Sequence, residues 1–104
     1  MAFSKSSRSI RLEQNADYRT CTLVAECQVE DEVYRESRLE LNKWIGNDDG
    51  TFDTQGENFI GSAHALELNG SRLRGLLDDR IRHAAWAEID LHEYVRNEGG
   101  VLKA

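Results

Sequence analysis

Residues 47–50 bring together side chains that carry the oxygen atoms of a possible cation site. They read Asn-Asp-Asp-Gly, and carboxylate and amide oxygens are the ligands that Ca²⁺ takes in loop sites. When Gly50 is placed at the glycine position of such a loop, Ile45 falls at the first ligand position. Gly56 then falls at the position of the bidentate glutamate. Neither residue supplies a carboxylate, so the pattern does not predict a calcium site.

Histidine and cysteine are also poorly placed for metal binding or catalysis. His64, His83 and His92 have no cysteine or second histidine at zinc-ligand spacing, so no metal and no cofactor is expected. Cys21 and Cys27 lie in a stretch that we predict to be extended. They are six positions apart, which would span about 20 Å of strand, whereas a disulfide needs Cα atoms within about 7 Å. We expect two unpaired thiols that act as small buried apolar groups, because no motif supplies an activating histidine.

Composition excludes further classes of function. The chain has 104 residues, enough for one domain, and its formal charge of −6 argues against a nucleic-acid partner. Its apolar runs are too short for membrane insertion. Residues 1–8 lack the apolar stretch of a secretory signal, which together with the unpaired thiols predicts a cytoplasmic protein. No motif marks an acid–nucleophile pair of carboxylates, so we do not expect an enzyme.

The chain repeats itself, and the repeat defines the elements that must position any polar site. Residues 37–52 match residues 87–102 at an offset of 50. The identical pairs are Leu41/Leu91, Asn47/Asn97 and Gly50/Gly100. Further upstream the offset is 56, which pairs Ser6 with Ser62. Chance apolar periodicity would not reproduce asparagine and glycine in register.

Each repeat is predicted to contain three strands, one helical turn and a β-hairpin. In the first repeat, strands are expected at residues 10–12, 22–25 and 34–41. In the second, they are expected on both sides of Asn69-Gly70 and at residues 86–91. The helical turns are expected at residues 41–45 and 91–95. Asn69 and Gly70 are expected to be the two turn residues of a hairpin, because both tolerate positive φ. Turns at 48–50 and 98–100 begin the final hairpins. One repeat is too small to bury its own sheet, so the two are expected to share one core.

The ends of the repeats carry a recognisable signature. Two tandem repeats that end in Leu-Asn-x-x-Ile-x-Asn-x-Asp-Gly, or a variant of it, resemble the cyanovirin-N homologue family. Residues 41–50 fit that signature fully and residues 91–100 fit it loosely. Residues 58–60 match the opening of the family's second repeat.

The resemblance implies an all-β, elongated, pseudo-twofold cyanovirin-N fold. Each repeat would give a triple-stranded sheet, a β-hairpin and short helical turns. Residues 1–53 and 54–104 would be the two repeats of one intertwined domain. Its pseudo-halves would be residues 1–43 with 94–104, and residues 44–93. Both a monomer and a domain-swapped dimer are compatible with the resemblance.

Founding members of the family have one disulfide bond in each half, and this chain lacks one or both cysteines of each pair. Cys27 occupies one such position, but Ser7 stands at its partner's place. Ala63 and Leu77 stand at the second pair. The sequence therefore resembles a disulfide-free fungal branch, in which packing must replace the stabilisation of two disulfide bonds.

Members of the family bind mannose-terminated oligosaccharides in a shallow, metal-free pocket at each end of the molecule. The resemblance thus implies mannose-rich glycans as partners. The central pocket maps onto Gly46, Asn47, Asp49, Glu57, Asn58, Ser62, Asp78, Asp79, Arg80 and Arg82. The terminal pocket maps onto Ala2, Lys5, Ser6, Gln28, Glu30, Asn97, Glu98 and Gly99. Gly99 stands where a carboxylate is expected and Ala2 where a basic residue is, so the central pocket is expected to bind better.

The same residues have a plainer explanation. Asparagine, aspartate and glycine are favoured in turns for backbone reasons alone. Asp78 and Asp79 replace a basic and a hydroxyl residue, and their carboxylates change the charge of the central pocket. The alternative function is therefore an intracellular structural or protein-interaction module that kept this fold and lost sugar binding.

Overall fold

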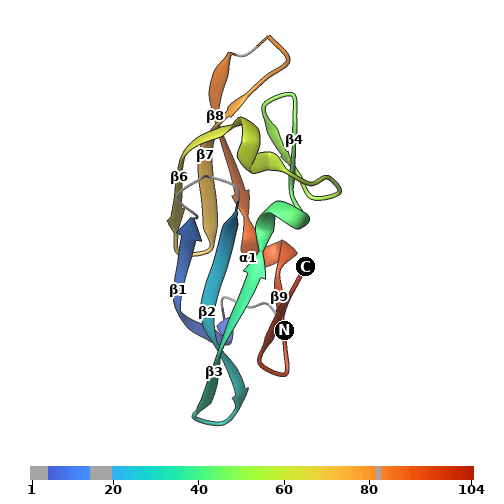
Figure 1. Cartoon of the computed structure of the whole chain (residues 1–104). Helices are drawn as coiled ribbons and strands as arrows, with labels where there is room; N and C mark the ends of the chain where they lie inside the picture. The colour runs from blue at the N-terminus through green and yellow to red at the C-terminus, as the bar shows by residue number, and fades with distance from the viewer. Residues whose placement is uncertain (1–4, 15–19, 82) are drawn as a thin grey trace.

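The computed structural model describes residues 5–14, 20–81 and 83–104 and shows an elongated all-β protein (Figure 1). Its principal extents are 49 × 26 × 20 Å. Two three-stranded antiparallel sheets account for most of the strand residues, and two short β-hairpins complete the set. The predicted fold class is confirmed.

The elements follow the same order in both repeats. The first sheet contains β1 (Ser7–Gln14), β2 (Cys21–Glu30) and β3 (Val33–Glu40). The second contains β6 (Ala63–Asn69), β7 (Arg72–Asp78) and β8 (Ala84–Asp90). The hairpins are β4 (Gly46–Asp48) with β5 (Thr51–Asp53), and β9 (Arg96–Glu98) with β10 (Val101–Lys103). The helical turns are η2 (Leu41–Lys43), η3 (Phe59–Ser62) and α1 (Leu91–Tyr94). None of these helical segments, nor any other in the described part of the chain, is long and apolar enough to cross a membrane.

The hairpin between β6 and β7 forms as predicted, but its turn lies one residue further along the chain. Asn69 is paired with Arg72 across the two strands, so the turn residues are Gly70 and Ser71. Gly70 has φ +63°, whereas Ser71 is not in the positive-φ region. Glycine at the first of two turn positions is the pattern of a type II′ turn, which needs positive φ at that position alone. The expectation that Asn69 is a turn residue was wrong for this reason.

The two final hairpins use a different turn, with positive φ at both central residues. Asp49 and Gly50 have φ values of 50° and 93°. Gly99 and Gly100 occupy the matched positions with φ values of 61° and 92°. This is the pattern of a type I′ turn, whose twist suits a two-residue hairpin. The predicted turns form at Asp49-Gly50 and Gly99-Gly100, whereas Asp48 and Glu98, which were predicted to lie in them, are the last residues of β4 and β9.

A carboxylate caps the helical turn that follows each sheet. The side chain of Glu40 accepts a hydrogen bond from Asn42 N at 3.3 Å, and that of Asp90 accepts one from His92 N at 3.0 Å. Asp90 also accepts a bond from Ser71 Oγ at 2.9 Å. The His92 N–H bond, followed by the Ser71 bond, holds the pKa of the Asp90 carboxyl below its ordinary value. These caps fix where strands β3 and β8 end and confirm the predicted helical turns.

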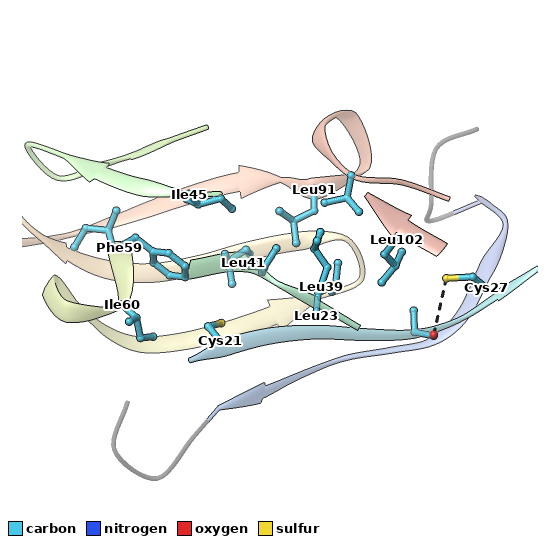
Figure 2. Packing of buried hydrophobic residues seen from close by; sticks show 14 residues of the cluster. Cys21, Leu23, Cys27, Leu39, Leu41, Ile45, Phe59, Ile60, Leu91 and Leu102 are labelled. Carbon is cyan, nitrogen blue, oxygen red and sulfur yellow. Dashed lines mark hydrogen bonds between the residues drawn. The ribbon is translucent and has the colours of Figure 1, made fainter. Parts of the chain in front are cut away.

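One cluster of buried side chains takes residues from both repeats (Figure 2). The fully buried pairs at matched positions are Leu23/Leu73, Leu41/Leu91 and Ile45/Val95. Phe59 is the largest fully buried side chain of the described residues and packs edge-on against Phe52, with ring centroids 5.6 Å apart. The expectation of a shared core is therefore met.

Each hairpin packs against the sheet of the other repeat. Leu102 N in β10 donates a hydrogen bond of 3.0 Å to Ser37 Oγ in β3. The β4–β5 hairpin approaches β8 and η3 of the second repeat in the same way. The chain therefore crosses between the two ends of the molecule near residues 41–46 and 91–95, as Figure 1 shows.

Both cysteines are free and fully buried. Cys27 is the strand partner of Ser7, whose Oγ donates a hydrogen bond of 3.5 Å to the thiol sulfur. Ala63 and Leu77 are strand partners as well. Both pairs of positions at which founding members have a disulfide bond are thus joined here by strand pairing, and the Ser7–Cys27 hydrogen bond adds to it at the first pair.

The buried thiols lead to a test by chemical modification. Burial, with the nearby Glu40 carboxylate as a smaller cause, raises the pKa of the Cys21 thiol to about 12. Thiolate is the reactive form, so we expect the native protein at pH 8 to react far more slowly than a free thiol with a disulfide reagent. In denaturant, two thiols per chain should react at the rate of free cysteine. Rapid modification of the native protein would contradict the burial of these side chains.

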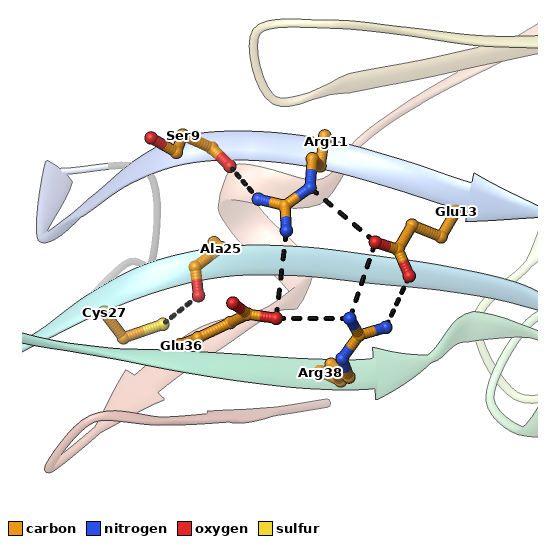
Figure 3. Close-up of polar contacts among 7 residues, drawn as sticks. All are labelled: Ser9, Arg11, Glu13, Ala25, Cys27, Glu36 and Arg38. Atoms are coloured by element: carbon orange, nitrogen blue, oxygen red, sulfur yellow. Dashed lines mark hydrogen bonds and ion pairs between the residues drawn. The ribbon is translucent and has the colours of Figure 1, made fainter.

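The outer face of the first sheet carries a network of ion pairs (Figure 3). Arg38 pairs with Glu13 and Glu36, and Arg11 pairs with the same two glutamates. The contact with Arg38 lowers the pKa of the Glu13 carboxyl and raises that of the guanidinium. Val24 lies between Arg11 and Arg38 in cross-strand register and is fully buried. The network thus shields an apolar side chain, although exposed ion pairs themselves contribute little stability.

Candidate functional site

Asn47 connects three segments at the central end of the molecule. Its Nδ2 donates to Ser62 Oγ at 2.7 Å and to the backbone oxygen of Asp78 at 2.8 Å. Its Oδ1 accepts from Gly50 N at 2.8 Å. One amide therefore joins the β4–β5 turn, the end of η3 and the end of β7. Asn47 is half-buried.

Asn97 repeats this arrangement at the terminal end. Its Nδ2 donates to Ser6 Oγ at 3.1 Å and to Gln28 O at 3.0 Å. Its Oδ1 accepts from Gly100 N at 2.8 Å. Asn97 is 7% exposed and Ser6 is 4% exposed, so this copy of the network is more deeply buried. The repeat seen in the sequence is thus reproduced bond by bond.

A polar hollow of about 620 Å³ opens beside Asn47, and we call it the central hollow. It is lined by Asn47, Asp48, Asp49, Gly61, Ser62, Asp78, Asp79 and Arg80. Six of these residues are among those that the sequence assigned to the central pocket. Carboxylate, guanidinium, amide and hydroxyl groups therefore face one concave surface, which provides both hydrogen-bond donors and acceptors.

Two carboxylates shape the loop that borders the central hollow. Asp49 Oδ1 accepts a hydrogen bond from Arg80 N at 2.9 Å, which joins the β4–β5 turn to the loop after β7. Asp79 Oδ1 accepts from Ile81 N at 3.0 Å and from His83 N at 2.9 Å. The donors are backbone groups, so the loop is held in one shape without using the Arg80 side chain.

The third carboxylate, that of Asp78, is engaged at the edge of the hollow. Its Oδ2 lies 3.2 Å from His64 Nε2. The backbone oxygen of the same residue accepts the bond from Asn47. Asp49 and Asp79 thus accept hydrogen bonds from backbone N–H groups and Asp78 contacts His64, so three of the four aspartates in the lining have a polar partner within the protein.

Gly46, Glu57 and Asn58 do not line the central hollow. A Cβ atom on Gly46 would lie 2.9 Å from Glu57 N, so glycine is needed here for the linker to pack against β4. Glu57 is exposed. Asn58 precedes η3 with φ +66°, a conformation that asparagine tolerates, and its Oδ1 accepts a 3.5 Å hydrogen bond from Asn42 Nδ2. Arg82 lies outside the described residues.

The terminal hollow is smaller, with a volume of about 330 Å³. It is lined by Ser6, Gln28, Val29, Glu30, Asp31, Asn97 and Gly99. Lys5 is exposed and does not line it. Glu98 also lies outside the lining and bonds to Arg96 at 2.9 Å, which holds the pKa of its carboxyl below the ordinary range. Ala2 lies outside the described residues.

The hollows differ most where Asp49 and Gly99 occupy matched positions. Both residues have a left-handed backbone, with φ values of 50° and 61°. The Asp49 carboxylate holds Arg80 N, whereas Gly99 has no side chain to reach the matched residue, Glu30. The terminal hollow therefore lacks the bond that fixes the loop of the central one.

The family model described as the CVNH domain matches residues 3–103 of the chain. The chain belongs to the CVNH family. It is 30% identical to the cyanovirin-N homologue of Neurospora crassa over an alignment of 111 positions, and the alignment covers 100% of this chain and 98% of that protein. The solved structure of Gibberella zeae CVNH is 38% identical and superimposes with a TM-score of 0.81, covering 97% of this chain and 94% of that one. Microvirin, solved as a mannobiose complex, is 25% identical to this chain and superimposes with a TM-score of 0.73. The superposition covers 96% of this chain and 94% of microvirin.

This CVNH chain thus has the carbohydrate-binding lectin fold of its family. Sequence reasoning missed four residues that line its hollows. These are Asp48, Gly61, Val29 and Asp31. A usable signal was present for Asp48, which stands between Asn47 and Asp49, two residues assigned to the central pocket. No sequence pattern marks Gly61, because it has no side chain and lines the hollow with the backbone of η3.

Proposed function

We propose that this CVNH chain binds mannose-containing oligosaccharides in the central hollow, without a metal ion. The observation that carries the proposal is the lining itself. Ser62, Asp78 and Arg80 bring hydroxyl, carboxylate and guanidinium groups to one open surface of a rigid end of the molecule. Sugar hydroxyls both donate and accept hydrogen bonds, so a sugar pocket needs both kinds of group on a fixed frame.

The network around Asn47 provides that frame. Its hydrogen bonds connect three chain segments before any ligand arrives, which reduces the entropy lost when a sugar binds. Arg80 is exposed, so its guanidinium is available to sugar hydroxyls. The mannobiose bound to microvirin supports a mannose-containing disaccharide as the smallest ligand to test.

We infer weaker binding, or none, at the terminal hollow. Its volume is about half that of the central one, at about 330 Å³ against about 620 Å³. Ser6 and Asn97 are almost fully buried, whereas the matched Ser62 and Asn47 are half-buried, so the terminal pair offers less to a ligand. Gly99 removes the carboxylate that stands at the matched position of the central hollow.

A structural or protein-interaction module of the same fold is the second candidate. The bonds that Asp49 and Asp79 make to backbone N–H groups favour it, because they give both residues a role in the absence of sugar. This candidate predicts a protein that folds normally and does not respond to any mannose-containing glycan.

Replacing Arg80 with alanine should weaken mannobiose binding about tenfold, because hydrogen bonds from a charged donor are lost while the fold is kept. The loop keeps its shape, since Asp49 bonds to the backbone of residue 80 and not to its side chain. Glu30→Ala, at the matched terminal position, is the control and should leave the affinity unchanged. Isothermal titration calorimetry measures both. Equal effects of the two variants would contradict the preference for the central hollow.

A further inference from the structure

A second hollow lies beside the central hollow, and we call it the side groove. It has a volume of about 480 Å³ and is lined by residues from the end of β1, from η3 and from the start of β6. Its lining includes Gln14, Ile60, Gly61, His64, Ala65 and Leu66. This volume is within the range of roughly 300–1,000 Å³ that is typical of small-molecule sites.

Two observations place the side groove next to the central hollow. Gly61 lines both of them. His64, which lines the side groove, lies 3.2 Å from the carboxylate of Asp78, which lines the central hollow. The two surfaces therefore meet along Gly61 and along the His64–Asp78 pair.

The boundary at Gly61 is open. A Cβ atom built on this glycine would meet no other atom within 4 Å, and the residue is exposed. No side chain of residue 61 stands between the two hollows, so a ligand could pass from one to the other across the backbone of η3.

The lining of the side groove matches the two faces of a pyranose ring. Ile60, Ala65 and Leu66 provide apolar surface, which suits the C–H face of a sugar. Gln14 and His64 are exposed and carry groups that donate and accept hydrogen bonds, as sugar hydroxyls require. An apolar floor with a few polar groups is the usual composition of a ligand site.

We propose that the central hollow and the side groove form one extended site for a glycan of at least three sugar units. The side groove holds the hexose that follows the disaccharide in the central hollow. This inference rests on the proposed function and adds the length of the glycan to it.

The chain offers a matched pair of variants for the test. Ala65 has φ +51° at an irregularity in the register of β6 with β7, between His64 and Glu67. Ser9 has φ +54° at the corresponding irregularity in β1, 56 residues earlier. Ala65→Leu fills the side groove without entering the lining of the central hollow, and Ser9→Leu introduces the same side chain on the same backbone conformation in the other half.

The experiment is calorimetric titration of the wild-type chain and both variants with mannobiose and with linear mannotriose. We expect mannotriose to bind about tenfold more tightly than mannobiose to the wild type and to Ser9→Leu. In Ala65→Leu the two affinities should become equal, with mannobiose unaffected. In parallel, mannotriose but not mannobiose should shift the side-chain amide signals of Gln14 and the backbone signal of Ala65 in the wild type.

Equal affinities for the two sugars in the wild type would overturn the extended site while leaving the proposed function intact. A mannotriose preference that survives in Ala65→Leu, without shifts at Gln14, would also overturn it. If neither sugar binds the wild type, the proposed function and this inference both fail. The signals of Gln14 and Ala65 decide the matter even if Ala65→Leu does not fold.

Discussion

Phe59→Ala should lower the free energy of unfolding by about 3–5 kcal/mol, the range for removing a fully buried aromatic ring. Phe59 is 0% exposed and belongs to the cluster that both repeats share. It also opens η3, where its backbone N–H bonds to Ile45 O at 3.1 Å and its carbonyl accepts from Ser62 Oγ at 3.4 Å. The cavity left by alanine would therefore weaken the packing of η3, the segment that supplies Gly61 and Ser62 to the central hollow.

Phe52→Ala is the matched control for this variant. Phe52 packs edge-on against Phe59 but is half-buried, so its loss should cost about 1–2 kcal/mol. Chemical denaturation followed by circular dichroism measures both values. If Phe59→Ala cost no more than Phe52→Ala, the shared core described above would be wrong.

Asn97→Ala should cost about 2–4 kcal/mol, because it leaves buried backbone groups without partners. The groups concerned are Gln28 O and Gly100 N, which bond to the Asn97 amide at 3.0 Å and 2.8 Å. Ser6 Oγ loses the hydrogen bond from the Asn97 amide as well. Asn97 is only 7% exposed, so water has little access to replace these bonds.

Asn47→Ala removes the matched network and serves as the comparison. Asn47 is half-buried beside an open hollow, so water can take over part of its role, and the expected cost is about 1–2 kcal/mol. Denaturant midpoints of the two variants give the comparison under one set of conditions. An Asn47→Ala chain less stable than Asn97→Ala would contradict the difference in burial between the two ends.

Much of the fold could be predicted because the two halves of the sequence repeat one pattern of apolar, asparagine and glycine residues. Asn47 and Asn97 occur in register with the glycines that follow them, and the same hydrogen bonds form around both. The turn after Asn69 shows the limit of local reasoning. Asn-Gly and Gly-Ser both suit a two-residue turn, and the strand register that places Asn69 opposite Arg72 decides between them.

The candidate site was harder to predict, because its geometry comes from contacts between distant segments. Asn47 reaches Ser62, 15 residues away, and the backbone of Asp78, 31 residues away. Gly46, inside the signature segment, and Asn58, at the opening of the second repeat, were both assigned to the central pocket, yet both serve the packing of the linker and lie outside the central hollow. A signature marks residues that the fold needs as well as residues that face a ligand, and only the three-dimensional contacts separate the two.

The most direct test of sugar binding is a titration of the ¹⁵N-labelled chain with mannobiose, followed by amide chemical shifts. We predict saturable shifts at Asn47, Asp49, Ser62 and Arg80, around the central hollow, with little change at Asn97 and Gly99. Unchanged spectra up to millimolar mannobiose would contradict the proposal and favour a module without sugar binding.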